Sequence, residues 1–318
     1  MEIVGTKYRV AAAATMSSFF AVGQVTLAAI AWAVPYWRHM TLILYIPQFI
    51  VITYLWIMPE NARWYLSKGR YEDAERVLED AARVNKKKLS EESRQIFKQI
   101  AQDSNNKGPE KEPWLVSLVL KNKPILVRTI ASPIWWISTM CVYYGLSVNA
   151  VHLVGNQYQN FMLVAAVEIP GFWLAVLLMN RIGRKPVLIG AFWVCAVCMG
   201  AYVFVPGGNY AVSLTLYLIG KCSISTVMVS IHLYTAELYP TKYRHSLFAF
   251  SSMMGRLGHI IAPLTPAFSE EVWADLPFAI FGCLALVSGA LVFLTPETLG
   301  ANLPDTMEQA ANIGRRKP

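Results

Sequence analysis

The run YAVSLTLYLIGKCSISTVMVSIHLYTA, residues 210–236, decides the fold of this chain, because Lys221 is the only charged residue within it. An α-helix rises about 1.5 Å per residue, so about 20 apolar residues cross the hydrocarbon core of a bilayer. Residues 210–236 are therefore long enough to cross a membrane as one helix.

Other runs share this length and apolar character. One of them, Thr129–Val151, contains polar residues such as Ser138 and Asn149, as expected of a helix that faces a cavity rather than lipid. So many apolar runs cannot all be buried in a protein dissolved in water, and we predict an all-α polytopic membrane protein with about eight transmembrane helices. The remaining runs are Ala11–Pro35, Leu42–Met58, Phe161–Met179, Val187–Pro206, Phe248–Phe268 and Phe278–Leu294.

The composition agrees with this class. The chain is 55% hydrophobic and 15% charged, with a mean hydropathy of +0.39, whereas a soluble domain carries about 25% charged residues. Its five cysteines all fall within apolar runs, so we expect packed thiols, Cys195 and Cys198 included, and no metal site. The motifs HExxH, GxSxG and the P-loop do not occur. We expect neither an enzyme nor a cofactor.

The basic residues predict the orientation in the membrane. With eight spans, all but four of the 28 Lys and Arg residues fall on one side; the exceptions are Arg38, Arg128, Lys221 and Arg256. Lys and Arg accumulate in cytoplasmic loops. Both termini and the long loop 59–124 are therefore predicted to be cytoplasmic, and this placement of the net charge of +8 argues against a nucleic-acid partner.

The long loop contains a helical pattern. Apolar residues recur at helical spacing from Tyr71 to Ala82, and Asn85–Leu89 is expected to end that helix. Ser104–Pro113 has the composition of a linker, and Trp114–Leu120 that of a short interfacial segment. Two interpretations are open: a regulatory domain, or solvated helices that join two membrane bundles.

A Pro-Glu turn follows two of the apolar runs, at Pro59-Glu60 and again at Pro296-Glu297. Repeated halves are typical of secondary transporters. The chain also resembles the organic ion transporters of the major facilitator superfamily, which carry organic cations, anions and zwitterions such as carnitine. The resemblance covers nearly the whole chain, in residues 59–78, 143–162, VEIPGFW (167–173), NRIGRKP (180–186), YTAELYPTKYR (234–244), GRLGHIIAP (255–263) and 296–310.

The resemblance implies a division of the chain, because the family has twelve spans and only the fifth to the twelfth are matched. Residues 1–58 would supply the last two helices of an N-terminal bundle, and 59–124 the central cytoplasmic loop. Residues 125–295 would form the C-terminal six-helix bundle, and 296–318 a cytoplasmic tail.

The family motifs also predict a cytoplasmic charge network. In NRIGRKP, Gly183 permits a tight turn that turns Arg181 and Arg184 toward the carboxylates of Glu237 and of Glu60 or Glu297. Such a network would hold the cytoplasmic helix ends together in one state of the carrier. The alternative is simple anchoring by positive charge. Asn180 replaces the family's usual Asp, which weakens one contact. Arg63 and Arg244 complete the expected set.

Three ionisable residues lie deep within predicted spans: Glu168, Lys221 and Arg256. Charged groups in a membrane are costly and usually functional. The resemblance implies that Arg256 discriminates the sign of the substrate, and an arginine suits a carboxylate. Two cations against one acid favour an anionic substrate. The alternative is a buried pair of Glu168 with Arg256 or Lys221 that only docks helices.

Further candidates surround these residues. Tyr143 and Tyr144 match a substrate-contacting pair in the family, although either could simply pack between helices. Ser225 and Met228 share a helix face with Lys221, and Phe20 pairs similarly with Gln24. His259 lies one turn beyond Arg256 and could titrate near neutral pH.

The sequence therefore predicts a carrier of small organic ions that works by alternating access in a lipid bilayer, in the plasma membrane. A carboxylate-bearing anion or a carnitine-like zwitterion is the favoured substrate, and the coupling ion stays open. Two alternatives are kept: a sugar carrier of the same fold, and a truncated membrane scaffold that transports nothing.

Overall fold

The computed structural model describes residues 9–57, 62, 65, 70–86, 114–205, 209–241, 243–300, 304 and 307–313. Helices and turns make up these residues, and no strand occurs among them. They fall into two compact units. One comprises Lys7–Pro35 and Trp114–Pro318, and the other Met1–Thr6 and Tyr36–Pro113. The division at residues 58, 124 and 295 stays a prediction.

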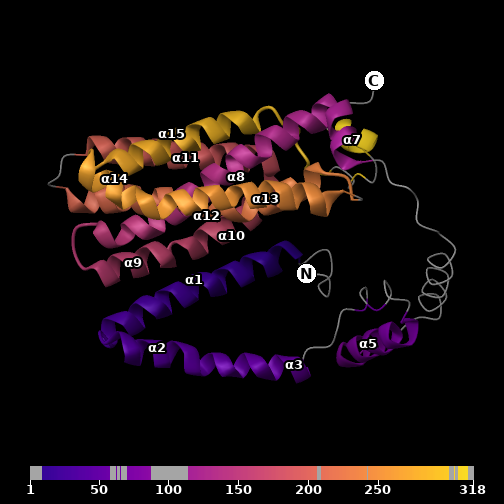
Figure 1. Ribbon diagram of the computed structural model, residues 1–318, viewed down its shortest axis with the longest axis horizontal. Coiled ribbons are helices and arrows are strands. Elements are labelled where there is room, and N and C mark those ends of the chain that lie inside the picture. Colours follow the sequence, from indigo (N-terminus) through magenta and orange to yellow (C-terminus); the bar gives the residue numbers. More distant parts are fainter. Residues whose placement is uncertain are drawn as a thin grey trace. The chain divides into compact units, whose positions relative to one another are not determined.

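The larger unit is a bundle of apolar helices that lie side by side (Figure 1). Its long helices are α1 (Arg9–Ala33), α8 (Lys123–Asn149), α9 (Gln157–Ala166), α10 (Glu168–Arg181), α11 (Arg184–Phe204), α12 (Tyr210–Leu238), α13 (Arg244–Ile261) and α15 (Leu276–Val292). Short elements are α7 (Leu115–Lys121), η3 (Ala150–His152), η4 (Ala262–Leu264), α14 (Thr265–Glu271) and α16 (Met307–Ala311).

Six helical segments in the described residues are long and apolar enough to cross a membrane. They are Ala11–Ala33, Lys123–His152, Gln157–Arg181, Arg184–Phe204, Tyr210–Leu238 and Arg244–Glu271. A seventh apolar helix, α15, has 17 residues and is shorter. The all-α polytopic fold is thereby confirmed, with six clear spans where the sequence predicts about eight.

The smaller unit holds the expected span Leu42–Met58, which is not one regular helix. It consists of α2 (Trp37–Tyr45), the 3₁₀ segment η2 (Ile46–Thr53) and α3 (Tyr54–Ile57). Pro47 in η2 has no backbone N–H to donate, which disfavours a continuous α-helix there. The amphipathic helix α5 (Tyr71–Val84) ends near the predicted break, where Lys86 has a positive φ of 52°.

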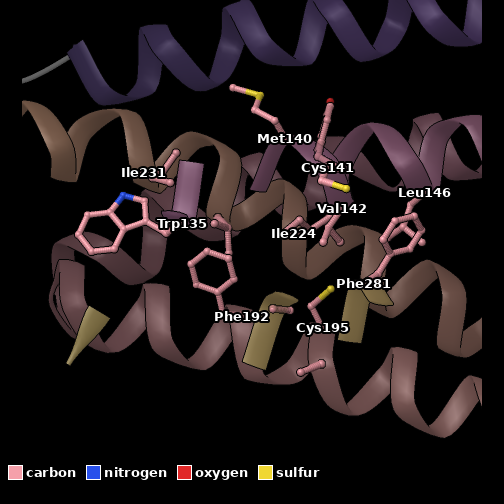
Figure 2. Packing of buried hydrophobic residues seen from close by; sticks show 14 of the residues in the cluster. Trp135, Met140, Cys141, Val142, Leu146, Phe192, Cys195, Ile224, Ile231 and Phe281 are labelled. Carbon is pink, nitrogen blue, oxygen red and sulfur yellow. The ribbon is translucent and has the colours of Figure 1, made fainter. Parts of the chain in front are cut away.

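The core of the larger unit is built from α8, α11, α12 and α15. Figure 2 shows Trp135, Phe192, Cys195, Ile224 and Phe281 among the buried side chains of this cluster. The helices α8 and α13 approach closely at Gly258, where a Cβ atom would lie 2.1 Å from the backbone oxygen of Ile137. This close contact fixes the rotation of α13 about its own axis, and therefore which of its faces points away from α8.

A second apolar cluster brings α7 and the start of α8 together with α16 near the end of the described chain. Val119, Ile125, Tyr239, Leu247, Met307 and Ala310 pack together there. Arg128 of α8 is buried beside them and donates hydrogen bonds from Nη1 to the carbonyl oxygens of Ala310, at 2.6 Å, and Leu238, at 3.4 Å. One arginine thus holds α16 and the end of α12 to α8.

Candidate substrate site and charge network

A buried ion pair connects α12 with the first residue of α10. The Nζ atom of Lys221 lies 2.9 Å from Oε1 of Glu168, and both side chains are 0% exposed. Lys221 also donates to the backbone oxygen of Tyr143 at 2.9 Å and to Oγ of Ser147 at 2.7 Å. The second carboxylate oxygen, Oε2, accepts hydrogen bonds from the hydroxyl of Tyr143 at 2.6 Å and from Nε2 of Gln24 at 3.1 Å.

This pairing is the alternative that the sequence left open between Lys221 and Arg256 as the partner of Glu168. Glu168 neutralises the charge of Lys221, and the Nζ atom of Lys221 also lies 3.7 Å from the ring centroid of Tyr143. Four helices meet at the pair, because Gln24 belongs to α1 and Tyr143 to α8. Lys221 is therefore not a second free cation for a substrate.

Arg256 differs from Lys221 in both exposure and partners. It lies on α13, is exposed, and forms no ion pair with any residue in the described part of the chain. Tyr144 of α8 and His232 of α12 are the groups of the neighbouring helices on which its charge acts. Of the three predicted intramembrane charges, Arg256 is the one that is exposed and has no ion pair in the described part of the chain.

Aromatic rings form a chain of contacts that starts at the ion pair and reaches His259 of α13. The Tyr144 ring stacks on the His259 imidazole, with centroids 3.6 Å apart and planes inclined by 25°. Tyr143 meets Tyr144 edge to face at 5.0 Å. The two tyrosines have different surroundings: Tyr143 is buried on the ion pair, whereas Tyr144 is partly exposed. Only Tyr144 offers an accessible ring and hydroxyl.

The remaining predicted residues take varied positions. Ser225 is buried and donates to the backbone oxygen of Lys221, one turn earlier on α12. Met228 is partly buried, and its carbonyl oxygen lies 2.6 Å from Nδ1 of His232. Phe20 is 54% exposed on α1 and lies outside the network. The structure thus gathers Lys221, Glu168 and Tyr143 in one place, with Gln24.

Two residues of the region were not predicted. Ser147 binds Lys221, and its position one turn after Tyr143 on the same helix face was the available signal. His232 packs its ring edge to face on Trp136 at 4.7 Å. A histidine within an apolar run marked it in the sequence.

A separate cluster of charges lies where α10, α11 and α12 end or begin. Arg184 Nε lies 3.2 Å from Oε2 of Glu237, with side chains 14% and 16% exposed. The same carboxylate oxygen accepts a 2.5 Å hydrogen bond from Oγ1 of Thr298. The contact expected between these two residues is present, and its role in gating stays a prediction.

Glu297 acts on the backbone rather than on a basic side chain. Its two carboxylate oxygens accept hydrogen bonds from the backbone N–H groups of Arg184 and Lys185, each at 2.9 Å. These groups begin α11, where N–H groups lack partners within the helix and the helix dipole favours negative charge. Gly183 precedes them with φ of +118°, a left-handed conformation that suits glycine.

Other expected members of the network are placed differently. Arg181 is exposed and has no ion pair among the described residues. Arg244 donates from Nη2 to the backbone oxygen of Tyr239 and to Thr241. Glu60 and Arg63 lie outside the described residues.

Comparison with known proteins identifies the family to which this chain belongs. The model of the family described as "Sugar (and other) transporter" matches residues 2–309. The organic cation transporter protein of Drosophila melanogaster is 36% identical over 99% of this chain and 58% of its own length. Human solute carrier family 22 member 16 is 33% identical over 98% of this chain and 54% of its length. The chain therefore spans about half the length of the curated relatives it matches.

Solved structures agree on the fold. The proton:xylose symporter XylE bound to 6-bromo-6-deoxy-D-glucose superposes with a TM-score of 0.67 over 95% of this chain and 67% of that one. An inward-open conformation of XylE from E. coli has a TM-score of 0.63. These superpositions show a shared fold. At sequence identities of 18% and 15%, they carry no information on the substrate.

Proposed function

Because the chain belongs to the sugar (and other) transporter family of the major facilitator superfamily, with organic ion transporters among its relatives, we propose that it serves the transport of small organic ions. The mode of action is alternating access in the plasma membrane, with both termini and the loop 59–124 in the cytoplasm. This family consists of transporters and not of enzymes.

The proposed substrate carries a carboxylate. The observation that supports this is the contrast between the two cations: Lys221 is neutralised by Glu168, while Arg256 is exposed without an ion pair in the described part of the chain. A guanidinium presents a planar pair of donors that matches a carboxylate. An organic anion, or a zwitterion such as carnitine, fits this charge.

Tyr144 supplies the second contact. Its ring is partly exposed and lies within the electrostatic reach of Arg256. A carboxylate on Arg256 would place the rest of a small substrate against this ring, and a quaternary ammonium group gains attraction from an aromatic face. A purely cationic amine gains the same face but meets the uncompensated charge of Arg256, which is unfavourable at low effective dielectric.

The experiment is binding to the purified chain in nanodiscs, with radiolabelled benzoate, carnitine, tetraethylammonium and D-xylose as probes. We expect the two carboxylates to bind and Arg256→Gln to weaken them at least about tenfold, since a charge-assisted hydrogen bond contributes about 1.5–3 kcal/mol. Arg38→Gln is the matched control, because Arg38 is an exposed arginine on α2 in the other unit.

Each other result contradicts the proposal. Binding of tetraethylammonium alone reverses the sign argument, and binding of xylose alone supports a sugar carrier. Failure of all four probes to bind a folded chain supports a scaffold without transport.

A further inference from the structure

His259 is a titratable residue beside the proposed carboxylate site, and it has no hydrogen bond to a described residue. It follows Arg256 by three residues on α13, so both side chains lie on one helix face. Its ring stacks on Tyr144 at 3.6 Å, and neither ring nitrogen forms a hydrogen bond with a described residue. One nitrogen of the neutral ring is therefore free to accept a proton, and the other, which carries a hydrogen, is free to donate to a ligand.

A positive charge on His259 would be repelled by that of Arg256, which lies one turn away on the same helix. From α8, His259 meets the neutral Tyr144. The titratable groups of α12 in this region are His232, on which Arg256 acts, and Lys221, whose charge Glu168 of α10 balances. The segment η4, which packs on α13, has no titratable residue. The local balance is thus one positive charge, that of Arg256.

A carboxylate bound to Arg256 removes this opposition. With the arginine neutralised, a proton from solvent can bind to an imidazole nitrogen, and the resulting cation keeps its stack on the electron-rich face of Tyr144. By linkage, each ligand then raises the affinity for the other. The substrate's negative charge and the proton's positive charge cancel, so binding the two together leaves the net charge of the site unchanged.

We propose that His259 is a proton-binding residue of the substrate site, which takes up one proton together with the carboxylate that binds Arg256. The inference rests on the proposed function, because it needs a carboxylate at Arg256. It names the coupling ion as a proton and assigns its site to the His259 imidazole that stacks on Tyr144.

The experiment measures proton uptake on binding of benzoate to the purified chain. Titration calorimetry in buffers of different ionisation enthalpy reports the protons taken up per bound ligand. We expect uptake near pH 7 and an affinity that falls by up to about tenfold per pH unit between the pKa of the free imidazole and the higher pKa of the ligand-bound imidazole. His259→Gln should bind benzoate more weakly, with no proton uptake and no dependence on pH between about 6 and 8.

Two further variants make the result specific. His259→Lys carries a fixed positive charge and should bind benzoate without proton uptake at every pH in that range. His232→Gln, a change at the other histidine near Arg256, should keep the uptake of the unmodified chain. Thermal unfolding of each variant shows that it is folded.

The outcomes separate this inference from the proposed function. Benzoate binding without proton uptake, or unchanged uptake in His259→Gln, overturns the role of His259 and leaves the carboxylate site intact. If proton uptake is lost in His232→Gln but kept in His259→Gln, the proton binds to His232, and this result also overturns the inference. Absence of any carboxylate binding to the folded chain rejects the proposed function, and the inference with it.

Discussion

Lys221 and Glu168 form a salt bridge of 2.9 Å in which neither side chain is exposed, and the bridge joins the middle of α12 to the start of α10. Each partner is also hydrogen-bonded from α8, through Tyr143 and Ser147. A buried pair offsets its desolvation only when such extra hydrogen bonds are present. The pair therefore acts as a junction of helices.

Breaking one half of this junction should destabilise the chain strongly. Lys221→Met leaves the Glu168 carboxylate buried without its counter-ion. Glu168→Gln likewise leaves the Lys221 ammonium group buried without a counter-ion. We expect each to cost about 3–5 kcal/mol, and the double variant to recover much of that loss. Thermal unfolding in detergent measures it. Glu270→Gln, at an exposed position, is the control. A double variant whose loss equals the sum of the two single losses would show that the pair is not coupled.

The turn before α11 provides a second test. In Gly183→Ala the new Cβ would lie 2.8 Å from Oε2 of Glu297, at a φ of +118° that disfavours alanine. We expect destabilisation of about 1–3 kcal/mol. Gly190→Ala, within the same helix, meets no atom within 4 Å and should be neutral or slightly stabilising. If both changes behave alike in thermal unfolding, the cap by Glu297 does not constrain this turn.

The contact between Arg184 and Glu237 predicts a conformational effect. Arg184→Gln removes the positive charge that pairs with Glu237. Arg181→Gln, in contrast, changes an exposed arginine that has no ion pair with a described residue. We expect Arg184→Gln alone to increase labelling of a cysteine introduced at residue 180 by a membrane-impermeant maleimide. Identical labelling of the two variants would argue for anchoring by positive charge and against a gate.

Much of this architecture could be predicted from the sequence, because the signal for a membrane helix is local. Length and apolar character within one run predicted α12 and α8, and the spacing of apolar residues predicted α5. The extent of the 3₁₀ segment Ile46–Thr53 was not predictable from Pro47, since one missing donor does not fix where regular α-geometry resumes.

The pairing of charges could not be predicted in the same way. Both Lys221 and Arg256 were candidate partners of Glu168, and the choice depends on how each helix is rotated about its axis. The close contact at Gly258 sets that rotation for α13. Glu297 likewise caps a helix that begins more than 100 residues earlier in the chain, and no local pattern reports such a contact.

Arg128 supports the last prediction, because it connects α8 to the end of the described chain. Its guanidinium is buried and donates to the carbonyl oxygens of Ala310 and Leu238. Arg128→Met keeps the volume but leaves both carbonyls without this donor, at a cost of about 1.5–3 kcal/mol for hydrogen bonds to a charged group. We expect α16 to open more often, with amide hydrogen exchange in Met307–Ala311 faster by about tenfold or more. Lys123→Met, at an exposed position on the same helix, should leave that exchange unchanged. Equal protection of α16 in both variants would mean that the apolar contacts of Met307 and Ala310 hold it without Arg128.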